Sequence, residues 1–264
     1  MESALEWHSA LALLDWQVDL GADEAIGDAP VDRFAVAKEA AEKAQARKAQ
    51  AQGQAEDHVV RRKEVDAVEV AREAASTAKS LDELQAAIAD FDHCTLKRGA
   101  RSLVFADGHA SARVLILGEA PGRDEDREGR PFVGRAGQLL DRMLAAIDLD
   151  RSADTPEKAV YITNVLPWRP PQNRDPEPEE IAMMLPFVQK HIELVAPDFI
   201  VLMGNIACRA GLGKQGILRL RGTWAQAFGK PALPMTHPAY LLRQPHAKRD
   251  AWADLLSLRA RLNG

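Results

Sequence analysis

Residues 113–137 read RVLILGEAPGRDEDREGRPFVGRAG, and this stretch decides the fold that we expect. It opens with a short apolar run that ends at Leu117 and passes into a glycine-rich turn at residues 118–122. This order is typical of a buried parallel strand that ends in a tight turn. Ligands of open α/β sheets bind beyond the carboxyl ends of such strands, and glycines let a ligand approach the backbone. The sequence therefore predicts a binding site directly after this strand.

The chain around this stretch alternates strand and helix patterns. Apolar runs predict four strands, at residues 113–117, 160–166, 199–203 and about 233–236. Helical spacing predicts helices after them, near residues 136–147, 178–194, 205–211 and 247–262. Strands that alternate with helices form parallel sheets covered on both faces. The fold class that we predict is α/β, a three-layer α/β/α arrangement with a central, mostly parallel four-stranded sheet.

The first 80 residues differ from the rest in pattern. Residues 4–20 carry apolar residues at helical spacing, which predicts an amphipathic helix that packs on the main domain or, alternatively, binds a partner. Residues 34–78 are rich in Ala, Glu, Lys, Gln and Arg, as solvated helices and flexible linkers are. Ser80 and Glu83 form a capping box before a helix at about 81–91. We therefore predict a helical or linker N-terminal extension over residues 1–80 and a globular domain over residues 81–264.

Composition and charge restrict the possible functions. The chain has 264 residues, 46% of them hydrophobic, and no apolar run approaches the length of a membrane span, so we expect no membrane partner. Its two cysteines, Cys94 and Cys208, give no disulfide framework, so a reducing cytoplasm is the expected location. The net charge is −5, but residues 1–93 hold 20 acidic and 10 basic side chains. The remaining residues are therefore basic overall, which suits a polyanionic partner.

Polar and aromatic side chains stand at the expected strand ends. Glu119 follows the first strand, and Phe132 lies shortly after it. Asn164 belongs to the end of the second strand, and His237 follows the fourth. The carboxyl ends of parallel strands lie along one edge of a sheet, so these side chains should surround one small polar pocket. Each residue alone has an ordinary structural explanation, but their joint placement favours a site.

Two other patterns carry less weight. Residues 211–216, GLGKQG, fit the dinucleotide-binding pattern G-x-G-x-x-G, but they follow a helix and lead into a loop. That motif should follow a strand and open a helix, so we discount it. His93 and Cys94 are adjacent, yet two ligands do not make a zinc site.

Several separated motifs resemble those of the family 4 uracil-DNA glycosylases. They are GEAPGRDED at residues 118–126, GRPFVGRAGQLLD at 129–141, YITNV at 161–165, RPPQNRDP at 169–176 and MTHPAYLLR at 235–243. The resemblance covers roughly residues 91–262 and keeps the family's motif order, which is far more specific than any single motif. It implies that residues 81–264 form a catalytic domain with the uracil-DNA glycosylase fold and that residues 1–80 lie outside the family's usual core.

The resemblance implies a uracil pocket. Phe132 would stack on the base, and Asn164 would bond to N3–H and O4, which distinguishes uracil from cytosine. Backbone N–H groups of the turn would meet the uracil oxygens, at Gly118, Ala120 and Gly122. An enzyme of this kind flips the nucleotide out of the stack and reads its Watson–Crick edge.

The resemblance also implies catalytic groups. His237, together with the turn, would stabilise the negative charge that develops at uracil O2. Glu119 and Glu125 are the candidates for orienting or activating water, with Asp126 less favoured. The sequence leaves the choice among these carboxylates open.

Residues 237–243 resemble the loop that enters DNA in this family. Leu241, Leu242 or the guanidinium plane of Arg243 would fill the hole left by the flipped base. The implied substrate is uracil-containing DNA, single- or double-stranded, and the implied products are uracil and an abasic site in base excision repair. No lysine lies in the motifs and no basic insertion follows Asn164, so simple hydrolysis by a monofunctional enzyme is expected. We also expect a monomer.

Three alternatives remain at the level of the sequence. They are a non-catalytic nucleic-acid-binding module, a glycosylase acting on another deaminated base, and a hydrolase of free nucleosides. The loop at residues 237–243 and the basic catalytic half favour polymeric DNA as the ligand.

The cofactor is the point at which the sequence departs from the family. Family 4 enzymes typically hold a [4Fe–4S] cluster on four cysteines, and the matching positions here are Phe91, Cys94, Trp168 and Met184. Such a cluster normally needs four thiolate ligands, and only one of these residues is a cysteine. We therefore predict no iron–sulfur cluster and no other cofactor. Large apolar side chains around Trp168 should fill the vacated volume by packing.

Overall fold

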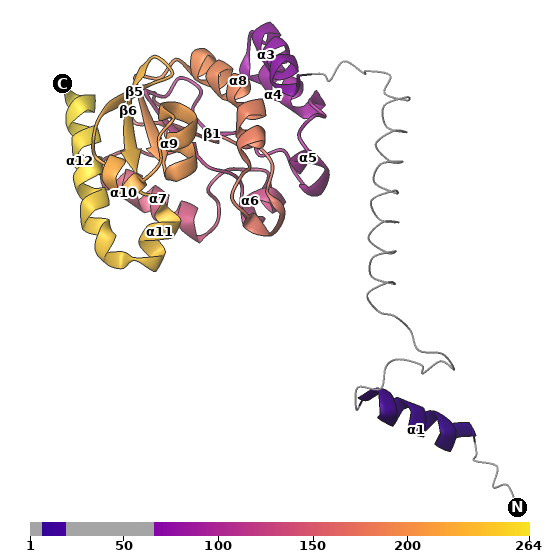
Figure 1. Ribbon diagram of the computed structural model, residues 1–264. Coiled ribbons are helices and arrows are strands. Elements are labelled where there is room, and N and C mark those ends of the chain that lie inside the picture. Colours follow the sequence, from indigo (N-terminus) through magenta and orange to yellow (C-terminus); the bar gives the residue numbers. More distant parts are fainter. Residues whose placement is uncertain (1–6, 20–65) are drawn as a thin grey trace, which may run out of the picture. The chain divides into compact units, whose positions relative to one another are not determined.

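The computed structural model describes residues 7–19 and 66–264, in a chain that divides into two units, residues 1–64 and 65–264 (Figure 1). The first unit contains the helix α1 (Trp7–Asp19), which confirms the helix predicted near residues 4–20. Large apolar side chains of α1 are exposed, among them Trp7 at 74%, Leu14 at 60% and Trp16 at 58%. The packing of α1 on the main domain stays a prediction. The solvated helix or linker predicted at 34–78 lies outside the described residues as far as residue 65.

The second unit is built on one six-stranded sheet with the strand order β1-β3-β2-β4-β6-β5. The four inner strands run parallel, as predicted, and an antiparallel strand closes each edge. The edge strands contain only two or three residues, which is too few for a periodic pattern to reveal them. The strands are β1 (Asp107–Gly108), β2 (Val114–Gly118), β3 (Val160–Asn164), β4 (Phe199–Met203), β5 (Ala225–Ala227) and β6 (Lys230–Met235).

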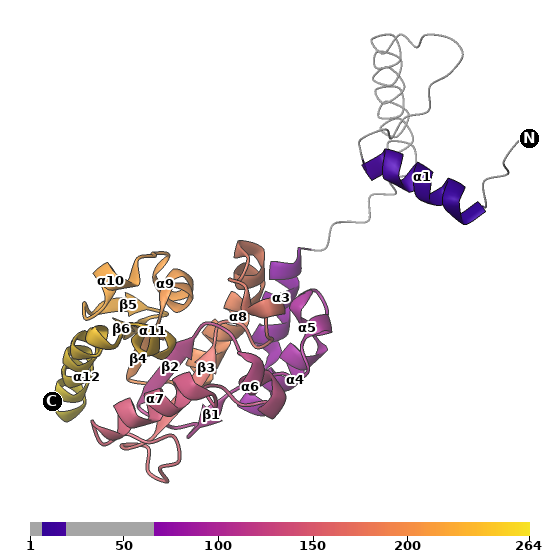
Figure 2. The same cartoon turned by 90° about the horizontal axis from the view of Figure 1, so that it is seen from below.

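Helices cover both faces of this sheet. Successive side chains of a strand point to opposite faces. Leu115 and Leu117 of β2 pack in a core with α8 (Pro178–Val195) and α9 (Asn205–Leu212). Val114 and Ile116 of the same strand pack in a second core with α7 (Arg135–Ala145) and α12 (Lys248–Asn263). The predicted α/β/α arrangement is therefore confirmed, and Figure 2 shows the sheet between these helix layers.

Two further helices cover the outer side of α8. They are α3 (Ala67–Thr77), which begins after the N-cap Asp66, and α4 (Leu81–Asp90), which begins after the predicted N-cap Ser80. Ala71 and Leu84 of these helices are fully buried in one hydrophobic cluster with Phe187 of α8. The boundary predicted between residues 80 and 81 therefore falls inside the compact unit, which begins at residue 65. The predicted extension, residues 1–80, includes α3 because the sequence of this helix is rich in Ala and Glu, like the residues before it.

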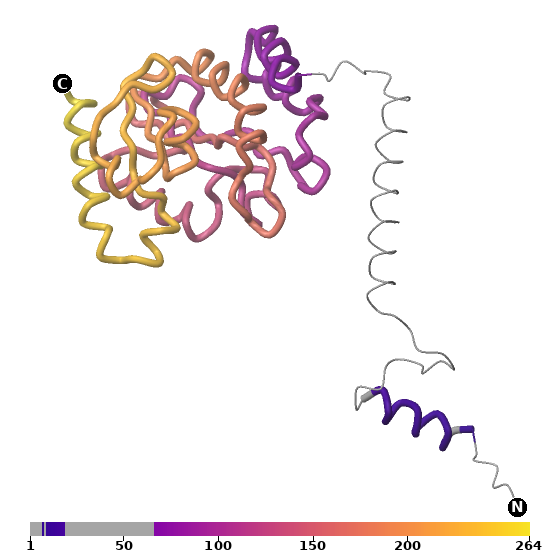
Figure 3. Tube along the Cα trace, in the orientation of Figure 1, coloured from indigo at the N-terminus to yellow at the C-terminus, as the bar shows by residue number. Residues whose placement is uncertain are grey.

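Short helices complete the second unit. Figure 3 follows its chain from the purple α3 to the yellow α12 at the C-terminus. Among the described residues, no helix combines the length and apolarity needed to cross a membrane. The short elements are α5 (Leu96–Gly99), α6 (Arg123–Glu128), α10 (Ile217–Leu220), α11 (Pro238–Arg243) and two 3₁₀ turns, Pro171–Asn173 and Pro245–Ala247.

Candidate active site

A cavity of about 550 Å³ lies where the parallel strands end. Its walls come from the segments that follow β2, β3, β4 and β6, which is the edge of the sheet that the sequence indicated. The structure thus brings most of the predicted site residues together. Those that line the cavity are Glu119, Ala120, Gly122, Glu125, Phe132, Asn164, His237 and Arg243.

Gly118 lies at the end of β2, where it pairs in register with Asn164 of β3. A Cβ atom at Gly118 would lie 2.2 Å from Asn164 Oδ1 and 2.7 Å from Cε2 of Phe132. Both distances are too short for a real side chain, so the absence of a Cβ lets the amide and the ring approach the strand end. Asn164 is 7% exposed and lines the cavity.

Glu119 is half-buried on the wall of the cavity. Burial raises the pKa of its carboxyl group, and the negative charge of Asp175 raises it further. In the part of the chain that the structure describes, no hydrogen bond engages this carboxylate. A carboxylate in this setting is available to accept a proton from water.

Glu125 also lines the cavity, but its two carboxylate oxygens are engaged by the backbone. Oε2 accepts a hydrogen bond from the N–H of Gly122 at 3.1 Å. Oε1 accepts from the N–H groups of Val133 at 3.0 Å and Gly134 at 2.9 Å. Glu125 therefore ties the glycine-rich turn to the start of α7. The N–H of Gly122 donates to Glu125 in this way, and its contact with uracil stays a prediction.

Asp126 lies behind the cavity, with 8% of its surface exposed. Its Oδ1 accepts hydrogen bonds from the backbone N–H groups of Arg101 at 2.8 Å and Ser102 at 3.2 Å. These bonds fix the segment after α5 to α6. The carboxylate of Asp126 therefore has a structural role, and a part in activating water stays the less favoured prediction.

Phe132 and His237 face one another in the cavity. Their ring centroids are 5.4 Å apart, and the ring planes are inclined by 27°. Phe132 is 6% exposed and comes from the segment between α6 and α7, whereas His237 follows β6. Both aromatic rings thus line the same cavity as the amide of Asn164, where a flat heterocycle can stack on an aromatic face.

The protonation state of His237 follows from its contacts. Its Nδ1 accepts a hydrogen bond from the N–H of Ala239 at 3.1 Å, as the N-cap of α11. Burial and, to a smaller extent, the cation of Arg243 lower the pKa of His237 to about 4, and the negative charge of Glu125 opposes them in part. The imidazole is therefore neutral at neutral pH. Because Nδ1 is an acceptor, the proton resides on Nε2, which is left to donate.

The loop at residues 237–243 corrects one prediction. Leu241 is 1% exposed and packs in a hydrophobic cluster with Leu139 and Ala251, so its burial contradicts the proposed insertion into DNA. The helix α11 turns this side chain inward, which a stretch of seven residues does not reveal. Leu242 is half-buried at the edge of the same cluster. Arg243 is exposed and lines the cavity, so it is the best placed of the three.

Sequence reasoning missed part of the cavity wall. The proline-rich segment RPPQNRDP was recognised as a motif, but no residue in it received a role. In the structure Arg174 lines the cavity and makes a bidentate ion pair with Glu180, at 2.9 and 2.6 Å. Glu180 also accepts from the N–H of Glu177 at 2.8 Å at the start of α8. The segment follows β3, so its position after a strand end was the signal available.

Known proteins match this chain over the same region. A family model described as the uracil DNA glycosylase superfamily matches residues 105–256. The type-4 uracil-DNA glycosylase of Archaeoglobus fulgidus is 37% identical over 185 residues, which cover 67% of this chain and 90% of that protein. The chain belongs to the type-4 uracil-DNA glycosylases. The enzyme of Thermotoga maritima is 40% identical over 57% of this chain and 77% of its own, and that of Sulfurisphaera tokodaii is 33% identical over 68% and 84%.

The iron–sulfur cluster implied by the family does not fit the residues of this type-4 chain. Phe91, Cys94, Trp168 and Met184 are all buried and belong to one hydrophobic cluster. Only Cys94 offers a thiol, and burial raises its pKa, which favours the protonated form over the thiolate that binds iron. Within residues 7–19 and 66–264, no group of three or more His, Cys, Asp or Glu side chains is placed to hold a metal ion. The packing predicted around Trp168 is confirmed.

Proposed function

We propose that this chain removes uracil from DNA by hydrolysing the N-glycosidic bond, as a monofunctional glycosylase of base excision repair. The observation that carries the proposal is the cavity at the strand ends, which joins an amide, two aromatic rings and a carboxylate in a chain of this family. The substrate is uracil-containing DNA, single- or double-stranded, and the products are free uracil and an abasic site.

Recognition rests on Phe132 and Asn164. The flipped uracil enters the cavity, and Phe132 stacks on its face. The amide N–H of Asn164 donates to O4, while its carbonyl oxygen accepts from N3–H. Cytosine carries an amino group at C4 and no hydrogen on N3, so an amide held in this orientation loses both partners, and such a mismatch is strongly rejected. The backbone of Gly118 and Ala120 completes the contact with the uracil oxygens.

Bond cleavage requires stabilisation of the leaving group. The bond between C1′ and N1 breaks, its electron pair moves onto the base, and negative charge develops at O2. The Nε2–H of the neutral His237 donates to this oxygen. The sugar acquires oxocarbenium character, which calls for a nucleophilic water on the opposite side of C1′.

Glu119 is the group that we assign to this water. The oxygen of water bonds to C1′, and its proton passes to the carboxylate of Glu119, whose raised pKa makes it the stronger base. Glu125 acts as a positioning residue, because its oxygens hold the backbone of residues 122, 133 and 134.

The remaining parts of the proposal concern DNA and partners. Arg243, on the rim of the cavity, fills the space left by the flipped nucleotide. The basic part of the chain binds phosphates and releases counterions, so binding weakens as salt rises. We further propose that the enzyme works as a cytoplasmic monomer, without an iron–sulfur cluster or another cofactor.

The experiment that tests this function uses two oligonucleotides that differ only at one position, uracil or thymine. Full-length protein is incubated with each, and alkali then cleaves the strand at abasic sites. We expect cleavage at the uracil position alone, and only after alkali, because the enzyme has no lyase activity. Strand scission without alkali would contradict simple hydrolysis. Intact uracil DNA after alkali would contradict the proposed function.

A further inference from the structure

Phe132 has an unusual backbone conformation for an aromatic residue. Its φ angle is 54°, in the left-handed region that glycine and asparagine normally occupy. Such a conformation is unfavourable for an aromatic residue and persists only where neighbouring groups over-determine it. We assign Phe132 to uracil stacking, and groups outside its own side chain must therefore hold its backbone in this conformation.

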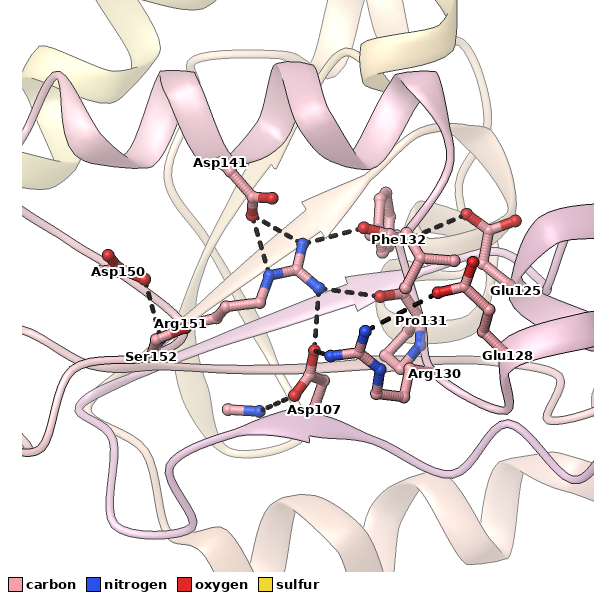
Figure 4. A network of polar contacts seen from close by, with 12 residues as sticks. Asp107, Glu125, Glu128, Arg130, Pro131, Phe132, Asp141, Asp150, Arg151 and Ser152 are labelled. Carbon is pink, nitrogen blue, oxygen red and sulfur yellow. Dashed lines mark hydrogen bonds and ion pairs between the residues drawn. The ribbon is translucent and has the colours of Figure 1, made fainter.

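Arg151 holds the carbonyl side of this residue. Its Nη1 donates to the carbonyl oxygen of Pro131 at 2.9 Å, and its Nη2 donates to that of Phe132 at 3.0 Å. Figure 4 shows the guanidinium group beside both carbonyls, between Asp107 and Asp141. Arg151 comes from the segment after α7 and lies 19 residues further along the chain than Phe132. Its side chain is only 11% exposed.

Two carboxylates fix the guanidinium group in turn. Nη1 donates to Asp107 Oδ2 at 3.0 Å, from strand β1. Nε donates to Asp141 Oδ1 at 2.8 Å, and Nη2 lies 2.7 Å from the same oxygen, on helix α7. The five contacts match the five N–H donors of an arginine. A lysine has three donors on one atom and cannot form this planar arrangement.

The opposite side of Phe132 is held by Glu125. Its Oε1 accepts from the N–H groups of Val133 and Gly134, the two residues that follow. The carbonyl oxygen of Phe132 also lies against Gly137, where a Cβ atom would approach it to 1.7 Å. Arg151 thus binds the carbonyl groups of residues 131 and 132, and Glu125 binds the N–H groups of residues 133 and 134.

We propose that Arg151 is a positioning residue for uracil excision, which sets the place of the Phe132 ring through the carbonyls of Pro131 and Phe132. This inference rests on the proposed function. Arg151 does not line the cavity and touches no substrate, so any effect on the reaction must pass through Phe132. Displacement of a positioned group by about 1 Å can cost 10²-fold in rate.

The test compares Arg151→Met and Arg151→Lys with Arg259→Met. Arg259 is the control, since it also bonds to a carbonyl, that of Ile147 at 2.9 Å, and to a carboxylate, that of Asp148 at 2.7 Å. Unlike Phe132, neither of these partners lines the cavity. Single-turnover excision is measured with saturating full-length enzyme on a uracil-containing single strand. We expect both Arg151 variants to be slower by roughly 10- to 100-fold. Arg259→Met should stay within about twofold of the parent.

A double-mutant cycle separates positioning from general stability. Phe132→Ala slows excision, and adding Arg151→Met to it should change the rate by no more than about twofold, because the ring that Arg151 positions is gone. Affinity for an oligonucleotide with an abasic site should be unchanged in the single variant Arg151→Met. If Arg151→Met does not fold, the same cycle is run with Arg151→Lys, which keeps a cation between the two carboxylates.

The possible outcomes distinguish the positioning role of Arg151 from the proposed excision of uracil. Equal losses from Arg151→Met with and without the Phe132 ring would overturn the positioning role while leaving uracil excision intact. Excision at the parent rate by the folded Arg151 variants would do the same. Parent-like excision by Phe132→Ala would overturn the stacking role and the inference together. A parent protein that releases no uracil would overturn the proposed function, and the inference with it.

Discussion

At the scale of single residues, the candidate carboxylates of Glu119 and Glu125 differ in the groups that they contact. Glu119 faces the cavity without a hydrogen bond from the described residues, whereas Glu125 accepts three backbone N–H groups. Glu119→Gln should therefore slow excision by roughly 10²- to 10⁴-fold, as expected for loss of a general base. Its melting temperature should stay close to that of the parent. Single-turnover rates and thermal melts measure both effects.

Glu125→Gln serves as the contrasting variant. A glutamine keeps one acceptor oxygen but places an NH₂ group against a backbone N–H, so buried donors lose their partner at a cost of about 1–3 kcal/mol. We expect a clear loss of stability here in addition to slower excision. A Glu119→Gln enzyme that excises uracil as fast as the parent would show that Glu119 does not activate the water.

His191 makes stability depend on pH. It is buried with Nε2 2.6 Å from the hydroxyl of Tyr161, and burial lowers its pKa to about 3. Between pH 6.5 and 3 the unfolded chain binds a proton that the folded chain does not, so stability falls as pH falls. At pH 5 this histidine should account for a loss of roughly 2 kcal/mol relative to neutral pH.

Urea unfolding at pH 7 and pH 5 tests this contribution. His191→Gln removes the titrating group, so the decrease in unfolding free energy between the two pH values should shrink by about the same 2 kcal/mol. The exposed His246 provides the control, since His246→Gln should leave the decrease unchanged. An identical pH dependence for His191→Gln and the parent would contradict the buried, neutral state of His191.

The site residues at or directly after the ends of strands were predictable from the sequence. Residues that lie outside the cavity and support its wall were not. Glu119 and His237 follow strands whose apolar runs are plain, and Asn164 ends such a strand, so their meeting in one cavity was predictable. Arg151 lies in a loop, and its contacts with Phe132 depend on the tertiary fold. The burial of Leu241 depends in the same way on the packing of α11 against α7.

At the scale of elements, the hydrophobic cluster around Trp168 joins α3, α4 and α8 to the segment after β3. Trp168 is 3% exposed, so Trp168→Ala should lower the unfolding free energy by about 3–5 kcal/mol. Trp252, which is 43% exposed on α12, is the control, and Trp252→Ala should cost much less. Denaturant unfolding of the two variants measures the difference.

The same cluster bears on the cofactor. Protein purified without oxygen should contain no stoichiometric iron or sulfide and should be colourless, because Cys94 is the one thiol among the four matching positions. A brown protein with stoichiometric cluster iron would contradict the predicted absence of a cluster. A parent-like unfolding free energy of Trp168→Ala would argue against hydrophobic packing as the replacement for the cluster.

The regular elements were predictable to the extent that their patterns were long. The parallel strands and the helices α7, α8, α9 and α12 lie within a few residues of the predicted ranges, because each spans a full period of apolar residues. β1, β5 and α6 gave no such signal. The two edge strands have at most three residues, and α6 is a run of charged residues, RDEDRE, that reads as a loop.

At the scale of the whole molecule, the division at residue 65 predicts where the chain can be shortened. A protein of residues 65–264 should keep the stability of the compact unit and excise uracil at the parent rate, because the cavity lies entirely within it. A protein starting at Ser80 lacks α3, whose Ala71 and Ala75 are buried against α8, and should melt at a lower temperature. A folded 65–264 protein without activity would assign residues 1–64 a part in the reaction.

The central claim is that the amide of Asn164 reads uracil in the cavity at the strand ends. The most direct measurement uses mass spectrometry to detect free uracil released from a uracil-containing oligonucleotide under single-turnover conditions. Asn164→Asp places a carboxylate that repels O4 and cannot donate to it, which should cost roughly 1.5–3 kcal/mol, or about 10- to 100-fold in rate. We expect rapid release by the parent and this loss in the variant. Release at equal rates by the two proteins would contradict it.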